Sequence, residues 1–480
     1  MNFSNVSKKI VFFGFFVFFL IVYYSVFTYS FAFTDTYFGI FTAFHHGMPG
    51  SLEAVYAGGR PLYALLNYAF YLTPDFESLK LLRLISIAGI ASTALFFAYY
   101  LRKKTSLSLP ASLSIAAIIG LIPSFQVYAA WAVCAFYPWA ALISAASFAV
   151  LDNENTPVLK RTVLSFFMLC ISISIYQSAA MMFWVPASIS WLMADKYFPS
   201  IKRLALAATV MLAGMATDFL LSKTLPNIIY NHPGHFSRTI LVSNFLGKIG
   251  WFFGDAMRSS LNLISIGCRK DVAVFVFLFI VFGLLFLFSG PRNLKIKKFI
   301  LAFLLLIGAY FPNLIIAENW ASYRTQVALT SLLIIYTAFA SIGWLAVLRL
   351  NRLKTVFFVG AVACSSYVAG HNVLVEFAKP QSEELKLISD YFTAHDNFDN
   401  APKIYLVPSS WTYSLAPIVR YDEFGLSSSV PLWVPQGMAW LVLREHHSPT
   451  ANRIDSALTG PLANAPKGAT IIDFGKILRP

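Results

Sequence analysis

The sequence predicts a mainly α-helical protein that crosses a membrane about eleven times and carries a small α/β domain at its C-terminal end. Of its 480 residues, 58% are hydrophobic and only 12% are charged, whereas about a quarter of the residues of a soluble domain are charged. Long uncharged runs recur along the chain, and basic residues cluster between them. This pattern explains the net charge of +14 as a topology signal and argues against a nucleic-acid-binding protein.

Uncharged or nearly uncharged runs of roughly 17 to 25 residues predict the membrane spans. The first run, 10–33, is about twice as long as the core of a signal peptide, so it predicts an uncleaved helix whose N-terminus stays inside. The pair at 162–177 and 178–194 is the shortest. The predicted spans are 10–33, 81–101, 111–130, 131–151, 162–177, 178–194, 204–225, 271–290, 299–316, 329–348 and 355–376.

Clusters of Lys and Arg orient these spans. All of the clusters fall on one side of the predicted membrane, and the positive-inside rule assigns that side to the cytoplasm. The segments 34–80, 226–270 and 317–328 and the tail after about 377 then lie outside. The clusters are Lys8/Lys9, Arg102/Lys103/Lys104, Lys160/Arg161, Lys196/Lys202/Arg203, Arg292/Lys295/Lys297/Lys298 and Arg349/Arg352/Lys354.

The tail differs in kind from the rest of the chain because it is polar. Its stretch "SEELKLISDYF" has the spacing of an amphipathic helix, and the runs at 403–407 and 470–474 are typical of strands. The tail therefore predicts an α/β domain over 378–480, after a transmembrane domain over 1–377.

Asp35 is the first candidate catalytic residue because it lies just beyond the outer end of the first predicted span. A carboxylate there is partly desolvated and still meets a substrate that comes from water, which suits a general base. The alternative is a helix-end residue in contact with headgroups and water. Glu53 lies in the same outer segment and either pairs with Asp35 or forms a salt bridge with Arg60.

Two outer arginines are candidate phosphate ligands. Arg60 follows two glycines that allow close backbone approach and precedes a proline that fixes the turn. Arg324 lies with Glu318 in the short outer connector "ENWASYRTQ". A guanidinium offers paired donors to phosphate oxygens and keeps its charge. The alternatives are an Arg60 that contacts lipid headgroups and a structural ion pair between Glu318 and Arg324.

Several polar residues fall inside the predicted spans or in the outer loop 226–270. Tyr176 and Gln177 either bind a substrate hydroxyl or form a helix–helix hydrogen bond, and Asp218 is expected to be structural or to line a cavity. The outer loop adds Arg238 as a supporting residue. Its "HPGH" is only a weak metal signal and the four cysteines are scattered, so neither a metal site nor a disulfide framework is predicted.

Together these motifs resemble the serotype-converting O-antigen glucosyltransferases, polytopic membrane enzymes of Gram-negative bacteria and their phages. The resemblance rests on "TDTYFG", "GGRPL", "SIYQSA", "ENWASYR" and "RYDEFGLSS", and runs through most of the chain. It implies a GT-C-like body in the bacterial inner membrane, with the C-terminal domain in the periplasm. It also implies transfer of glucose from undecaprenyl-phosphate-glucose to O-antigen, with no cofactor.

The resemblance also implies roles for individual residues. Asp35 would accept the proton of the attacking sugar hydroxyl, with inversion at the anomeric carbon, while Arg60 and Arg324 stabilise the departing phosphate. Family members typically carry two adjacent acids at the first position, whereas Thr36 follows Asp35 here. The base is thus assigned to Asp35 alone. The supporting or substrate-binding residues are Glu53, Tyr176, Gln177, Glu318 and Arg238.

Two other functions fit the same composition. An O-antigen polymerase or ligase shares substrates and compartment and is expected to centre on a long late outer loop, for which 226–270 qualifies. A lipid-linked sugar flippase or transporter also has many spans, but transporters usually show related halves, and this sequence shows no such symmetry. The long outer segment 34–80 and the polar tail favour an enzyme.

Overall fold

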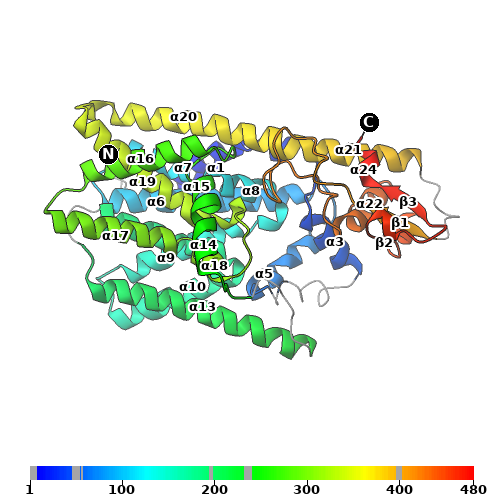
Figure 1. The fold of residues 1–480 in the computed structure, drawn as a ribbon, viewed down its shortest axis with the longest axis horizontal. Coiled ribbons are helices and arrows are strands. Elements are labelled where there is room, and N and C mark those ends of the chain that lie inside the picture. The colour runs from blue at the N-terminus through cyan, green and yellow to red at the C-terminus, as the bar shows by residue number, and fades with distance from the viewer. Residues whose placement is uncertain are drawn as a thin grey trace.

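The computed structural model of the chain describes residues 8–45, 55, 58–193, 198–231, 240–395 and 403–479. The protein is mainly helical, with 72% helix and 3% strand. Most of the long helices run along the long axis of the molecule, and the strands gather at one end of it (Figure 1). The longer helices are α1 (Lys8–Val22), α6 (Leu79–Lys104), α7 (Leu109–Ile119), α8 (Pro123–Ala130), α9 (Tyr137–Leu151), α10 (Val158–Ile175), α13 (Ile201–Tyr230), α16 (Lys270–Leu287), α17 (Arg292–Gly308), α19 (Val327–Val347) and α20 (Lys354–Val373).

Short helices and turns connect the long ones and supply much of the functional surface. They are α2 (Ser25–Thr28), α3 (Asp35–His45), α5 (Pro61–Leu66), η2 (Asn67–Tyr71), η3 (Ala132–Cys134), α11 (Gln177–Ala180), η4 (Met181–Phe183), α12 (Trp184–Ser188), η5 (Ile189–Met193), α14 (Phe245–Trp251), η7 (Phe252–Met257), α15 (Arg258–Ser260), α18 (Phe311–Ile315), η8 (Tyr323–Thr325), η9 (Asn351–Leu353) and η10 (Leu374–Ala378).

Among the described residues, seven helices are long and apolar enough to cross a membrane, or eight if the bent pair α7–α8 forms one span. The predicted count of eleven is therefore not confirmed. Helix α1 has 15 residues and α17 has 17, which is short for a helix that crosses alone. The run predicted at 178–194 is helical over 177–193, as α11, η4, α12 and η5 without a gap, but these 17 residues are too few for the seven or eight counted above.

The bend between α7 and α8 has a local cause and positions an outer loop. The two helices meet at 62°, with Gly120 at the end of α7 and Pro123 in the first turn of α8. Proline is well suited to that turn because its missing N–H has no partner there in any case. Helix α8 then holds the loop before α19: the Ser124 hydroxyl donates to the Tyr323 carbonyl at 2.6 Å, and the Tyr128 hydroxyl donates to the Arg324 carbonyl at 2.7 Å.

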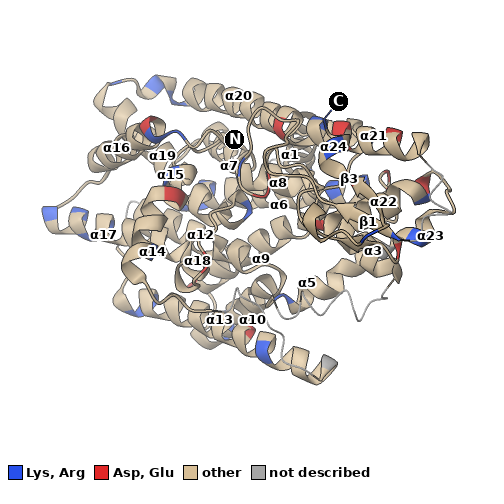
Figure 2. Ribbon diagram, turned by 45° about the vertical axis from the view of Figure 1, so that its right-hand side comes forward, with Lys and Arg blue, Asp and Glu red and all other residues tan. Residues whose placement is uncertain are grey.

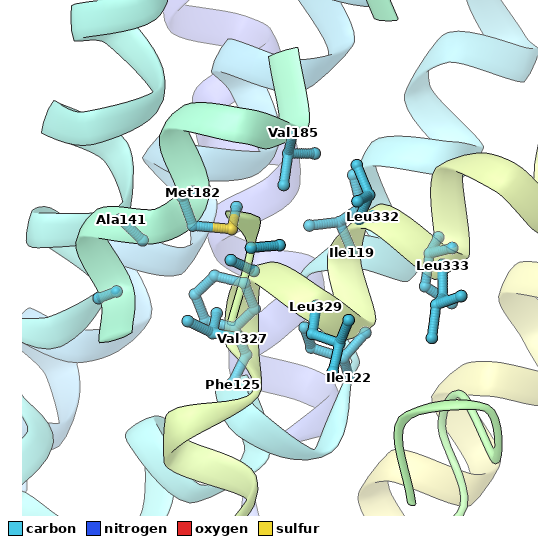
Figure 3. Packing of buried hydrophobic residues seen from close by; sticks show 14 of the residues in the cluster. Ile119, Ile122, Phe125, Ala141, Met182, Val185, Val327, Leu329, Leu332 and Leu333 are labelled. Carbon is cyan, nitrogen blue, oxygen red and sulfur yellow. The ribbon is translucent and has the colours of Figure 1, made fainter. Parts of the chain in front are cut away.

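Helix α19 lies at the centre of the bundle, and 83% of its apolar window is buried, against 22% for α16. Its residues Val327, Leu329, Leu332 and Leu333 pack among side chains from other parts of the bundle, including Phe125 of α8 (Figure 3). Since lipid is as apolar as these side chains, close packing rather than removal from water stabilises the contacts.

The predicted basic clusters gather at one end of the bundle. Lys104 at the end of α6 pairs with Asp152 at 2.5 Å, and Lys298 of α17 donates to the Leu192 carbonyl at 3.3 Å. Figure 2 shows Lys and Arg on α17 and α20 at the end away from the strands. The positive-inside rule requires the basic clusters to lie on one side of the membrane, as this arrangement allows. That this side is the cytoplasmic one stays a prediction.

The C-terminal region forms a three-stranded parallel sheet in the order β2-β1-β3, covered by helices. The strands predicted at 403–407 and 470–474 are confirmed as β1 and β3, and the amphipathic helix is confirmed as α21. The predicted domain boundary at 378 falls inside a continuous helix, 351–394. The elements are α21 (Lys379–Ala394), β1 (Ile404–Val407), α22 (Val434–Glu445), α23 (Ala451–Ile454), β2 (Leu458–Thr459), η11 (Leu462–Asn464), β3 (Thr470–Asp473) and α24 (Phe474–Ile477).

The C-terminal region shares its hydrophobic core with the segment that follows α1 and α2. Tyr37, Ile40 and Phe41 of α3 pack in the same buried cluster as residues of α21, α22 and β1. A Cβ atom on Gly437 of α22 would lie 2.7 Å from the Tyr37 carbonyl oxygen, so only glycine lets the two helices approach this closely. Asp35, the first residue of α3, is thus placed by the C-terminal region.

Candidate functional site

A cavity of about 490 Å³ lies between connecting loops and the ends of several helices. It is lined by the turn before α5, the break between α10 and α11, one face of α13, and α18 with the loop that follows it. Most of the lining is apolar, and its polar side chains converge from these different segments. The polar residues that line it include Arg60, Tyr176, Gln177, Ser178, Asp218, Ser222, Asn313, Glu318, Ser322 and Arg324.

Only glycine fits at position 59, in the turn before α5. Gly59 has a φ of +73°, and a Cβ atom there would lie 2.7 Å from Gln177 Nε2 and 3.4 Å from Asp218 Oδ2. Gln177 Nε2 donates to the Gly59 carbonyl and, at 3.2 Å, to Asp218 Oδ2. The close backbone approach predicted for "GGRPL" is confirmed, and it brings Arg60 to the cavity wall.

Arg60 is held by aromatic rings. Its Cζ lies 4.8 Å from the centre of the Tyr176 ring, and Nη1 donates to the Tyr137 hydroxyl at 3.4 Å. The two tyrosine rings stack on each other at 4.0 Å. Among the described residues no carboxylate lies within ion-pairing distance of Arg60, and its buried Nε has no hydrogen-bond partner there. Arg60 therefore has donor capacity for an anion.

Arg324 is held by acids of the C-terminal region. Its Nη2 pairs with Asp422 Oδ2, and its Nη1 lies 3.7 Å from Glu423 Oε1. The carboxylate of Glu423 also accepts the backbone N–H groups of Tyr323 at 2.7 Å and of Arg324 at 2.9 Å. Burial raises the pKa of Glu423, and the Arg324 guanidinium opposes this rise. The ion-pair partners found for Arg324 are thus Asp422 and Glu423, rather than Glu318.

Asp35 does not line the cavity. Its Oδ1 accepts a hydrogen bond from Trp433 Nε1 at 3.0 Å. Two residues before it, the Phe33 ring packs edge-on against Trp131 at 4.9 Å, and the Arg324 guanidinium lies 4.9 Å from that same indole. The Trp131 side chain therefore lies between the segment that carries Asp35 and the cavity.

Asp35 and Arg60 nevertheless act electrostatically on the same buried side chain. Burial raises the pKa of the Tyr63 phenol well above its ordinary value, and among the smaller causes Arg60 lowers it while Asp35 raises it. Tyr63 belongs to α5, directly after Arg60, and donates to the Val133 carbonyl at 2.7 Å. The structure brings Asp35, Arg60 and Arg324 into one neighbourhood, with the two arginines in the cavity wall and Asp35 outside it.

Some of the other predicted residues line the cavity, and the rest lie outside the described residues. Tyr176, Gln177 and Glu318 line the cavity, as does Asp218. Gln177 makes a helix–helix hydrogen bond, which was one of the two alternatives. Glu53 and Arg238 lie outside the described residues, as do both histidines of "HPGH". The described residues contain no group of three or more potential metal ligands.

The rim of the cavity is apolar and exposed. Leu212 and Phe219 of α13 line the cavity with 54% and 50% of their surface exposed, and Leu241 does so with 67% exposed. Helix α13 crosses the predicted bilayer, so these side chains face the apolar surroundings of the bundle. The cavity therefore joins a polar end at the arginines to an apolar rim.

Lys248 of α14 fixes the loop that carries Glu318. Its Nζ donates to the Glu318 carbonyl at 2.7 Å and to Asn319 Oδ1 at 2.9 Å, and it lies 4.1 Å from the centre of the Trp251 ring. Burial lowers the pKa of Lys248 to about 8, while Glu318 acts in the opposite direction. The sequence offered no local signal for this contact. Asp422 and Glu423 lie in the motif "RYDEFGLSS", but nothing in that motif predicted their pairing with Arg324.

Comparison with models of known protein families and with curated protein sequences finds no match. The resemblance to the O-antigen glucosyltransferases therefore stays a prediction.

Proposed function

We propose that this chain is a GT-C-like membrane glycosyltransferase that moves glucose from undecaprenyl-phosphate-glucose to O-antigen on the periplasmic side of the bacterial inner membrane. The observation that carries the proposal is a cavity with two arginines at its polar end and exposed apolar side chains at its rim. A phosphate attached to a long hydrocarbon chain has the same two-part character. Neither a soluble sugar nucleotide nor a free sugar would need the apolar rim.

The donor would lie with its phosphate against Arg60 and Arg324 and its polyprenyl chain past Leu212 and Phe219. Guanidinium groups stabilise the negative charge that the phosphate gains as its bond to the sugar breaks. Polyprenyl phosphate can therefore leave without a general acid. The phosphate would bind Arg60 Nε and Arg324 Nη1, which have no hydrogen-bond partner among the described residues, so binding would satisfy two buried donors.

Asp35 would act as the general base. In this reaction it accepts the proton of an acceptor hydroxyl, whose oxygen attacks the anomeric carbon from the face opposite the phosphate. The hydrogen bond from Trp433 orients the carboxylate, and both Asp35 and Arg60 lie within electrostatic range of Tyr63. A base on the far side of the sugar from the two arginines is the arrangement that inversion needs.

The test is O-antigen analysis in a strain whose O-antigen is unmodified. The strain would express the wild type, Asp35→Asn, Arg60→Gln, or Asp390→Asn as a control, since Asp390 is exposed on α21 away from the cavity. Mass spectrometry and NMR of the polysaccharide should show added glucose for the wild type and Asp390→Asn only. Full modification by Asp35→Asn would remove that residue from the mechanism. Altered chain length with an unchanged repeat unit would indicate a polymerase.

A further inference from the structure

Four buried polar atoms of the cavity lining have no hydrogen-bond partner in the described part of the chain. Three are able to donate: Arg60 Nε, Arg324 Nη1 and the hydroxyl of Ser322. The fourth, Asp218 Oδ1, is an acceptor, and the Asp218 residue is only 6% exposed. Buried polar groups in proteins are almost always hydrogen-bonded, so four exceptions in one cavity indicate a bound polar ligand.

Asp218 Oδ2 is hydrogen-bonded, and Oδ1 has no partner with hydrogen-bond geometry among the described residues, although the Ser174 hydroxyl lies near enough to stabilise the carboxylate. Gln177 Nε2 donates to Oδ2 at 3.2 Å, and the Gly59 turn lies on the same side. Helix α13 fixes the backbone, so Oδ1 is held in the cavity wall at a defined place. An acceptor left unpaired in an apolar cavity is unfavourable, and a donor on the ligand would relieve it.

The surroundings of Asp218 favour a neutral donor over a cation. Arg60 follows Gly59 directly, so a guanidinium lies close to the carboxylate and would repel a cationic ligand. No cluster of three or more metal-ligating side chains occurs among the described residues. A hydroxyl group is neutral and donates one hydrogen bond, which is what Oδ1 lacks.

We infer that Asp218 Oδ1 accepts a hydrogen bond from a hydroxyl of the sugar on the lipid-linked donor, and that this contact selects the sugar. The inference rests on the proposed function, because it takes the phosphate to be bound by Arg60 and Arg324. It adds a sugar subsite on α13, tied by Gln177 to the turn that carries Arg60. A site built to pair with a hydroxyl discriminates strongly against an analogue that lacks it.

The test varies both protein and ligand in full-length protein reconstituted in nanodiscs. The ligands are a short-chain polyprenyl phosphate, its glucoside, and the glucosides deoxygenated at C2, C3, C4 or C6. The proteins are the wild type, Asp218→Asn and the control Thr217→Val. Thr217 precedes Asp218 on α13, does not line the cavity and bonds only to its own helix. Asparagine keeps the shape of the side chain. If its amide nitrogen takes the place of Oδ1, the acceptor is lost; if it takes the place of Oδ2, the hydrogen bond from Gln177 is lost.

We expect one deoxy glucoside to bind the wild type about 10- to 100-fold more weakly than the full glucoside, because the missing hydroxyl leaves a buried acceptor without a hydrogen bond. Asp218→Asn should weaken the full glucoside by a similar factor and abolish its advantage over that deoxy analogue. Bare polyprenyl phosphate should bind Asp218→Asn and Thr217→Val as it binds the wild type.

Three results would overturn the inference. Equal binding of all the glucosides to the wild type would show that no hydroxyl is recognised, and this result needs no variant. Unchanged discrimination by Asp218→Asn would assign the hydroxyl contact to another residue. An equal loss of bare polyprenyl phosphate by Asp218→Asn would show a structural role. If bare polyprenyl phosphate does not bind the wild type, the proposed function fails as well, which distinguishes the two failures.

Discussion

Removal of Glu423 should detach the loop of Arg324 from the C-terminal region. Glu423 is fully buried and accepts two backbone N–H groups, those of Tyr323 and Arg324, besides lying 3.7 Å from the Arg324 guanidinium. The contact joins parts of the chain about a hundred residues apart. The loop conformation that presents Arg324 to the cavity therefore depends on one carboxylate.

The magnitude follows from the groups left behind. Glu423→Ala leaves two buried N–H donors without an acceptor, and each unsatisfied donor costs about 1–3 kcal/mol. Removing one partner of a buried pair costs about 3–5 kcal/mol in total. We expect about 3–5 kcal/mol for Glu423→Ala, since these contributions overlap. Glu423→Gln keeps one acceptor oxygen, so we expect about half of that loss.

The measurement is the rate of thermal unfolding in detergent, followed by tryptophan fluorescence, because large membrane proteins commonly unfold irreversibly. If the contact forms late in folding, a loss of about 3 kcal/mol speeds unfolding on the order of a hundredfold. Glu445→Gln is a graded control because, among the described residues, the one hydrogen bond that Glu445 accepts comes from the Phe76 N–H, at 3.0 Å. Glu383→Gln is a neutral control because Glu383 is 49% exposed. Equal rates for Glu423→Ala and Glu383→Gln would refute the reasoning.

Two further variants test the turn before α5 and the loop after α18. Gly59→Ala should abolish sugar transfer, because a side chain at φ +73° strains the backbone and its Cβ would lie 2.7 Å from Gln177 Nε2. Gly468→Ala is the control, since Gly468 has a φ of +77° and open space around it, so that variant introduces the backbone strain without the clash. Activity and stability are measured for both variants. The pKa of Lys248 is about 8 in the folded protein and about 10.5 in the unfolded chain. Between pH 8 and 10.5 the unfolded state therefore binds more protons than the folded state, so the free energy of unfolding should rise with pH in that range. Lys248→Met should lack this rise when unfolding rates are compared from pH 7.5 to 10.5, and an unchanged pH profile would contradict the assignment.

Local patterns predicted local structure well. The spacing of "SEELKLISDYF" predicted α21, and β-branched runs predicted β1 and β3, because each pattern fixes which side chains one element can bury. The "GGRPL" turn was also predictable, since glycine permits and proline enforces its geometry. In each case the causes lie within a few residues of the feature.

Features that depend on distant contacts were not predictable from these patterns. Asp422 and Glu423 belong to the motif "RYDEFGLSS", but nothing in the motif predicted that they hold Arg324 from almost a hundred positions away. The apolar run 178–194 matched a span by hydropathy, and the chain is helical over 177–193, but this helix contains 3₁₀ and π-helical turns that hydropathy does not report. Hydropathy reports how apolar a segment is, and packing against α9 and α19 decides its path.

The short segment from Gly59 to Tyr63 connects the parts of the proposed reaction. Gly59 lies against Asp218, Arg60 faces the cavity, and Tyr63 lies within electrostatic range of Asp35. In the proposed reaction the contacts to a sugar hydroxyl, to the phosphate and to the acceptor hydroxyl would all surround the anomeric carbon. Inversion requires the attacking and leaving groups on opposite faces of one carbon. The anomeric carbon would then have to lie between the phosphate at Arg60 and an acceptor hydroxyl that enters from water on the side of Asp35.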